Sequence, residues 1–267
     1  NDLVQLTNYL DYSISSMKAF TQLHSDKLSY QDFCSTTQNH IEILEKLHND
    51  VVHITPFATS LHKFGQIGEM LKMYYVLYTN PSYDDSLRYS VGFEGYINNI
   101  CNLYAHTKTN TISMCKFFDN DSKCSFDGQY YPAIIDTKPI TNDIDISTNM
   151  IISAPNKAGK TTILKSVLIN IIMSQQVGCG FYTNAQLTPY SHIHSYLNIP
   201  DTSGRDSLFQ AESRRCKEII DIIKDNDQND RHFCIFDELY SGTNPEEAVK
   251  SGNALLKYLE SFKNVNF

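Results

Sequence analysis

The stretch from Met150 to Lys165 constrains the fold most. A short apolar run at 150–152 leads into a loop of small residues, followed by Gly159-Lys160-Thr161 and then by apolar residues at helical spacing. This order predicts a strand, a loop and a helix. A bound polyphosphate requires inward-facing amide N–H groups, a helix N-terminus and a cation. The stretch therefore predicts a phosphate-binding loop (P-loop).

The P-loop template G-x-x-x-x-G-K-[ST] assigns a role to two of these side chains. Lys160 is expected to reach the β- and γ-phosphates, and the hydroxyl of Thr161 to ligate Mg²⁺. Ala154 stands where the template has its first glycine, and its methyl group restricts the backbone there. The alternative is a chance Gly-Lys-Thr sequence after a buried strand.

A second motif lies downstream, where the apolar run 233–236 ends in Asp237 and Glu238. A strand that ends in two acids places Asp237 at the carboxyl edge of the sheet, near the Mg²⁺ ion. Glu238 then lies beside the space from which a water attacks the γ-phosphate, where it can orient and deprotonate that water. The alternative is an acidic pair that caps an exposed strand end.

A third motif lies between the other two, at 203–212. Small residues followed by a helix start predict another helix N-terminus suited to phosphate, with Ser207 as a donor. If it is such a site, it completes the site of a neighbouring subunit across a dimer. An N-cap with Glu212 in the first turns explains the same residues equally well.

The first hundred residues carry apolar side chains mainly at spacings of three and four. This pattern predicts four or five amphipathic helices between Asp2 and Tyr104. Breaks are expected near 25–29, at 55–56 and across 80–85. We predict an all-helical domain at 1–110.

Short apolar runs alternate with helical patterns in the remaining part, 111–267. Strands are predicted at 114–118, 130–135, 144–146 and 233–236, with two more inside 181–196, and helices at 163–172, 205–224 and 246–262, with Gly178 ending the first. This alternation predicts an α/β domain whose mainly parallel sheet is flanked by helices.

Composition narrows the classes of function. The net charge is −8, from 22 Lys plus Arg against 30 Asp plus Glu, which argues against a basic nucleic-acid module. Seven cysteines without metal spacing indicate reduced thiols in an intracellular protein. The sequence contains no run of about eighteen apolar residues, so no membrane span is expected. It also shows no charged segment followed by an apolar one at its start, so no signal peptide is expected. His192 and His194 lie on an alternating segment without further ligands nearby in sequence, so a structural role is favoured over a metal site.

Together, the three motifs resemble one family. Ser153–Thr162, Ser203–Glu212 and Phe236–Pro245, in that order, are similar to the ATPase domain of the MutS family, the DNA mismatch-repair ATPases and their relatives among the ABC-type ATPases. The Pro155-Asn156 pair and the Ser241–Asn244 segment separate this family from other P-loop proteins. The motif similarity covers about 130–260, and the helices before it fit the family's core or lever region more loosely.

The resemblance implies a role for each matching residue. ATP and Mg²⁺ are expected on the loop formed by Pro155, Asn156, Lys157, Ala158, Gly159, Lys160, Thr161 and Thr162. Asp237 is expected to serve the metal and Glu238 the hydrolytic water. Ser207 is expected to contact the nucleotide of the partner subunit, and Ser241, Gly242, Thr243 and Asn244 to lie at the dimer seam.

The sequence also departs from the family pattern. The segment from Arg205 to Ser207 has one residue more than the usual spacing. The family continues past the position of Phe267 into a strand and a histidine that senses the γ-phosphate, so we expect a C-terminally truncated ATPase domain with poor turnover. A Phe-x-Glu mismatch-reading domain is also missing, since 92–95 lacks its spacing.

The function expected from this resemblance is the ATP-binding and dimerisation portion of a MutS-like DNA repair protein. ATP would close a homo- or heterodimer, and DNA would be bound through regions largely absent from this chain. Two alternatives stay open. One is a MutS-derived interaction scaffold that binds nucleotide weakly or not at all. The other is a P-loop small-molecule kinase, which gives no role to 241–244.

Overall fold

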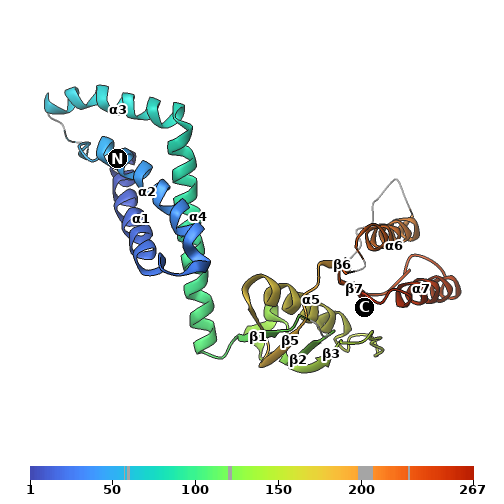
Figure 1. Ribbon diagram of the computed structural model, residues 1–267. Coiled ribbons are helices and arrows are strands. Elements are labelled where there is room, and N and C mark those ends of the chain that lie inside the picture. The colour runs from blue at the N-terminus through green and yellow to red at the C-terminus, as the bar shows by residue number, and fades with distance from the viewer. Residues whose placement is uncertain (57, 59–60, 120–121, 198–206, 228) are drawn as a thin grey trace. The chain divides into compact units, whose positions relative to one another are not determined.

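The computed structural model describes residues 1–267 apart from 57, 59–60, 120–121, 198–206 and 228, and divides the chain into two compact units (Figure 1). The first unit is Asn1–Tyr104 and the second is Ala105–Phe267. The sequence placed this division near 110, a few residues further along the chain. No helix in the described part of the chain is both long and apolar enough to cross a bilayer.

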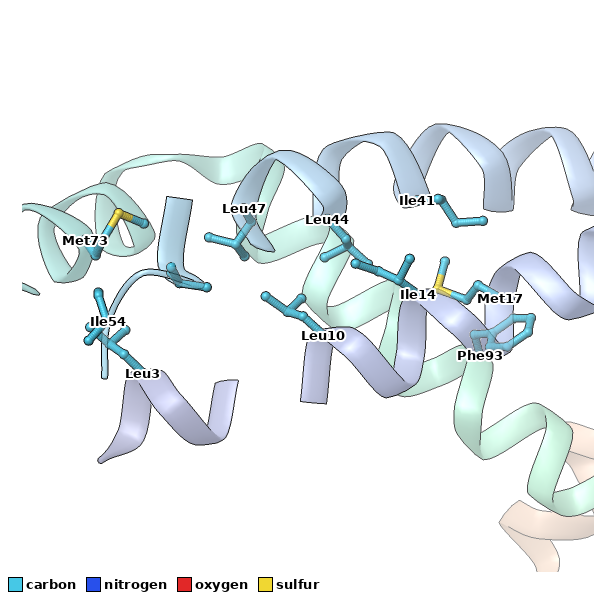
Figure 2. Packing of buried hydrophobic residues seen from close by; sticks show 11 residues of the cluster. Leu3, Leu10, Ile14, Met17, Ile41, Leu44, Leu47, Ile54, Met73 and Phe93 are labelled. Carbon is cyan, nitrogen blue, oxygen red and sulfur yellow. The ribbon is translucent and has the colours of Figure 1, made fainter. Parts of the chain in front are cut away.

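The first unit is helical. It contains α1 (Asp2–His24), a 3₁₀ helix (Leu28–Tyr30), α2 (Gln31–Val51), α3 (Leu61–Thr79) and α4 (Pro81–Lys108). The buried side chains of these helices form one core, seen in Figure 2, to which all four α-helices contribute: Leu3, Leu10, Ile14, Met17, Ile41, Leu44, Leu47, Met73 and Phe93. Their spacing of three, four and seven residues within α1 and α2 puts them on one face of each helix.

The break predicted across 80–85 is wrong beyond Asn80. Helix α4 begins at Pro81, and the Asn80 Oδ1 atom accepts a hydrogen bond of 3.0 Å from the amide of Ser82. Asparagine is a favoured N-cap, and proline fits the first helical position because its missing N–H has no partner there. The same Asn-Pro pair that suggests a loop therefore starts a helix.

The described residues of the second unit form two sheets. The larger has the strand order β3-β2-β5-β1-β4, with β1–β5 parallel and its other pairs antiparallel. Its strands are β1 (Ser113–Phe117), β2 (Cys124–Gln129), β3 (Asn142–Asp145), β4 (Cys179–Gly180) and β5 (Asn184–Leu187). The smaller sheet is parallel, in the order β6-β7-β8, from β6 (His192–Tyr196), β7 (His232–Phe236) and β8 (Val265–Asn266). Parallel pairing thus dominates only the smaller sheet.

Strand β7 lies between two hydrophobic clusters. Its residues Phe233 and Ile235 join a cluster with helix α5 (Lys160–Val177) and the larger sheet. Cys234 and Phe236 join a second cluster with α6 (Leu208–Asp225) and α7 (Pro245–Glu260). Successive side chains of a strand point to opposite faces, so burial on both faces explains the continuous apolar run. The strand prediction at 233–236 and the helix predictions at 163–172 and 246–262 are confirmed, and so is the helix at 205–224 from Leu208 onward, since 205–206 lie outside the described residues.

Two strand predictions are wrong. The segment predicted at 130–135 forms a 3₁₀ helix, Pro132–Thr137, which tolerates the missing N–H of proline at its start. The apolar run 150–152 is not a strand, and Ile151 is 77% exposed. The amide of Met150 donates to the carbonyl of Phe267 at 2.9 Å, and one such bond does not make a ladder.

Candidate functional site

The predicted P-loop residues lead directly into helix α5. Gly159 is the N-cap residue, with φ at 92°, a conformation that side-chain-bearing residues adopt only with strain. The helical ladder begins with the amide of Ile163, which donates to the carbonyl of Gly159. The amides of the first turn, at 160–162, consequently have no intrahelical partner. Helix α5 ends at Val177, and Gly178, the residue at which the sequence predicted the stop, is its C-cap with φ at 75°.

The ammonium group of Lys160 lies within this loop. Its Nζ donates to the carbonyl of Ala154 at 2.7 Å and to that of Pro155 at 3.2 Å. A pocket of about 360 Å³ opens at the same place. Predicted site residues line it, namely Asn156, Lys157, Gly159, Lys160, Thr161, Thr162 and Glu238. The structure therefore gathers a cation, a helix N-terminus and one of the two acids around one hollow.

The other acid, Asp237, is hydrogen-bonded to the first turn of α5. The hydroxyl of Thr161 donates to the Asp237 carboxylate over 2.7 Å, although 76 residues separate them. Asp237 follows the last residue of β7, and its amide donates to the carbonyl of Tyr196 at the end of β6. Parallel strands thus hold the carboxylate at their C-terminal edge, where the first turn of α5 reaches it.

The chain after Asp237 takes an unusual path. Glu238 and Tyr240 have φ angles of 49° and 58°, in the left-handed region that few non-glycine residues adopt. Such conformations cost free energy and persist only where neighbouring contacts impose them. The left-handed turn starts at the residue that lines the pocket.

Ser207 is the N-cap of α6. Its side chain accepts from the amide of Gln210, whose own side chain accepts from the amide of Ser207 at 2.9 Å. This reciprocal pair is a capping box, the structural alternative that the sequence left open for this serine. The other residues of the third motif that precede it, at 203–206, lie outside the described residues.

The Ser241–Asn244 segment, which follows β7 in the chain, forms hydrogen bonds with two helices, α6 and α7. The Asn244 side chain caps α7 by accepting from the amide of Glu247 at 3.0 Å, and Pro245 occupies the first turn. Ser241 and Gly242 donate to the carboxylate of Glu212 in α6. Sequence reasoning gave Glu212 only a place in the first turns of a helix. Its helical position could be predicted, but its partners about thirty residues away could not.

A histidine cluster occupies the smaller sheet. His194 and His232 are 4% and 0% exposed, and their rings are joined by a 3.0 Å contact between Nε2 and Nδ1. The ring of His192 stacks on His232, with centroids 4.7 Å apart. The Nε2 atom of His194 and the Nδ1 atom of His232 are hydrogen-bonded to each other rather than directed at a common ion, and no group of three potential ligands is found among the described residues. The packing therefore favours a structural role for His192 and His194, the two histidines named in the sequence analysis.

The donor set at the P-loop suits a magnesium nucleotide. Mg²⁺ usually takes one or two protein oxygens together with substrate phosphates and waters. Thr161 and Asp237 supply a hydroxyl and a carboxylate within 2.7 Å of each other. A triphosphate suits the amides at 160–162 and the Lys160 ammonium.

Comparison with known proteins finds similarity to the same family that the motifs resemble. Residues 150–266 match the family model described as MutS domain V. An Endonuclease MutS2 from Staphylococcus epidermidis is 30% identical over 148 residues, which is 53% of this chain and 18% of the relative. An Endonuclease MutS2 from Lactobacillus johnsonii is 32% identical over 133 residues, 47% of this chain and 16% of the relative.

A eukaryotic relative is similar over a comparable share of the chain. The DNA mismatch repair protein Msh3 of Dictyostelium discoideum is 32% identical over 135 residues, 50% of this chain and 9% of the relative. The chain therefore spans less than a fifth of the length of these relatives. These similarities support the MutS-family resemblance carried by the motifs.

Proposed function

We propose that the chain is the ATP-binding and dimerisation portion of a MutS-like DNA repair protein. In this proposal, residues 111–267 adopt the ABC-type P-loop ATPase fold and bind Mg-ATP. The observation that carries it is the 2.7 Å hydrogen bond from Thr161 to Asp237, beside a pocket that Lys160 and Glu238 line. The match to MutS domain V over 150–266 supports the same assignment.

Each side chain has one task in this proposal. Lys160 turns from the loop carbonyls to the β- and γ-phosphates, and the first-turn amides of α5 bind the same phosphates. Thr161 and Asp237 would hold the Mg²⁺ ion, which would neutralise charge on the phosphates. Glu238 orients a water and accepts its proton.

The trans contacts extend the proposal to a dimer. Ser207 and the Ser241–Asn244 segment would face the nucleotide of a second subunit, identical or related, so that the γ-phosphate bridges both. DNA would be bound by other parts of the whole protein, since the net charge of this chain is −8. The relatives' names, an endonuclease and a mismatch repair protein, support a role in DNA maintenance.

Mass measurements test this proposal. Light scattering should show a monomer without nucleotide and a dimer with Mg²⁺ and a non-hydrolysable ATP analogue. Glu238→Gln keeps the size of the side chain but removes the base, so with ATP this variant should stay dimeric longer than the wild type. A mass that is the same with and without the analogue would refute the proposal.

The alternative is an interaction scaffold. Ala154 replaces the first glycine of the P-loop template, and its carbonyl accepts from the Lys160 ammonium at 2.7 Å. Because the Lys160 ammonium already has hydrogen-bond acceptors within the loop, its transfer to a phosphate would contribute less to the free energy of binding. A scaffold would show no nucleotide-dependent mass and no difference between the wild type and Glu238→Gln.

A further inference from the structure

A buried carboxylate fixes the segment after the two acids to the start of α6. Glu212 is 2% exposed. Its Oε1 atom accepts from the amide and the hydroxyl of Ser241, both at 3.0 Å, and its Oε2 atom accepts from the amide of Gly242 at 3.1 Å. Hydrogen bonds to an ionised carboxylate are among the strong ones, and burial of a carboxylate without them is costly. Both oxygens of Glu212 therefore hold the segment.

Two packing contacts occur at the same place. The rings of Phe209 and Tyr240 lie with centroids 5.6 Å apart. A Cβ atom at Gly242 would stand 2.6 Å from the amide nitrogen of Phe209 and 2.9 Å from Leu208 Cβ. The backbone at Gly242 thus lies directly on the first turn of α6, at a distance that leaves no room for a side chain.

The other end of the segment is tied to the sheet. The amide of Asp237 donates to the carbonyl of Tyr196 at 3.2 Å, and the amide of Tyr240 donates to the hydroxyl of the same tyrosine at 3.3 Å. Glu238 lies between these two bonds, in its left-handed conformation. The position of Glu238 is therefore set from one side by β6 and from the other by α6 through Glu212.

We propose that Glu212 is a positioning residue that joins the start of α6 and the 238–242 segment into one mechanical unit. Ser207 caps the same helix five residues before Glu212. A displacement of the helix start is then transmitted to Ser241 and Gly242, and through them to the turn that carries Glu238. This inference rests on the proposed function for its consequence, which is that contacts at the dimer seam align the candidate base.

Amide hydrogen exchange tests the coupling without any nucleotide. Glu212→Gln keeps the shape of the side chain but replaces one acceptor by an NH₂ donor that faces another donor. Exchange at Ser241 and Gly242 should accelerate by about tenfold or more, and so should exchange at Gln210 and Ala211 in the capped turn of α6. The matched control is Glu218→Gln, an exposed glutamate of the same helix, which should leave all four amides unchanged.

The extent of the acceleration decides between coupling and a local role. Acceleration confined to Ser241 and Gly242 would overturn the proposal, because the helix start would then be independent of the segment. Gly242→Ala is a second variant that disturbs the same contact from the other side, and it should accelerate the same four amides. Thermal unfolding of each variant shows that it is folded during the measurement.

A second measurement tests the consequence. With a non-hydrolysable ATP analogue, Glu212→Gln should bind nucleotide within about twofold of wild type, because Glu212, Ser241 and Gly242 do not line the Lys160 pocket, but should dimerise about tenfold more weakly. Dimerisation equal to that of Glu218→Gln would overturn the proposed alignment. A wild type that does not bind the analogue would refute the proposed function instead, and the exchange pattern would still decide the coupling.

Discussion

We expect the second unit to lose stability in mild acid because of two buried histidines, His194 and His232. Burial and the neighbouring charges of His232, His192 and Arg215 lower the pKa of His194 to about 4. The pKa of His232 is lowered too, by burial and by His192, against an opposing effect of Asp230. In the unfolded chain these histidines take up protons near pH 6.5, whereas the folded His194 does not. Stability is therefore complete above that pH and falls as the pH decreases towards 4.

The expected size follows from the pKa difference at His194 alone. Protonation of the unfolded state should lower the free energy of unfolding by about 1 kcal/mol between about pH 7 and about pH 5.5, and by about 3 kcal/mol in total once the pH is below about 4. His232 adds to this in the same direction. The loss begins well above the pH at which carboxylates titrate, so it is separable from ordinary acid denaturation.

The assay compares two variants with the wild type. Urea titrations at about pH 7 and about pH 5.5, in which brief proteolysis reports the folded fraction of residues 105–267, give the free energy of unfolding. His194→Gln removes the titrating ring and should lose most of the pH dependence, whatever its stability at neutral pH. His106→Gln, at an exposed position of α4, should keep the wild-type dependence. Equal pH dependence in wild type and His194→Gln would refute the reasoning.

Three further predictions concern single side chains. Thr161→Val removes the hydroxyl that bonds the strand-end carboxylate and should weaken Mg-ATP binding about tenfold in a titration, whereas Thr161→Ser should retain it. Gly159→Ala should lower the free energy of unfolding by about 1–2 kcal/mol, because φ is 92° although the space for a methyl group is open; Gly252→Ala in α7, also in open space, should not destabilise. Burial raises the pKa of Cys234 to about 12, so a thiol reagent at mildly alkaline pH should modify exposed Cys101 first and Cys234 only on unfolding.

The sequence predicted the parts of the second unit that depend on local signals. Gly159 and Gly178 bound α5 because each takes a left-handed conformation that glycine favours. The run 233–236 is predictable as a strand because it is short, apolar and bounded by polar residues, a composition that burial on both of its faces explains. The rule that residues after parallel strands gather at one edge of a sheet applies to Asp237, which follows β7, whereas Thr161 reaches it from the first turn of α5 without a strand directly before the P-loop.

The remaining features depend on contacts between distant residues. An apolar run such as 150–152 becomes a strand only if another strand pairs with it, and the run itself does not reveal that partner. The Asn80-Pro81 pair is compatible with a turn and with a helix start, and the tertiary packing of the residues after it decides between them. The role of Glu212 depends on a segment that arrives from beyond β7, so no spacing rule within α6 could reveal it.

ATP binding by the Lys160 loop is the central claim, and a titration with Mg-ATP tests it most directly. Calorimetry on the wild type, Lys160→Ala and the control Lys165→Ala, a lysine of α5 that does not line the pocket, separates the loss of the phosphate contact from a general loss of charge. The wild type and the control should bind alike, and Lys160→Ala about a hundredfold more weakly or not at all. Equal binding by Lys160→Ala and the wild type would contradict the claim.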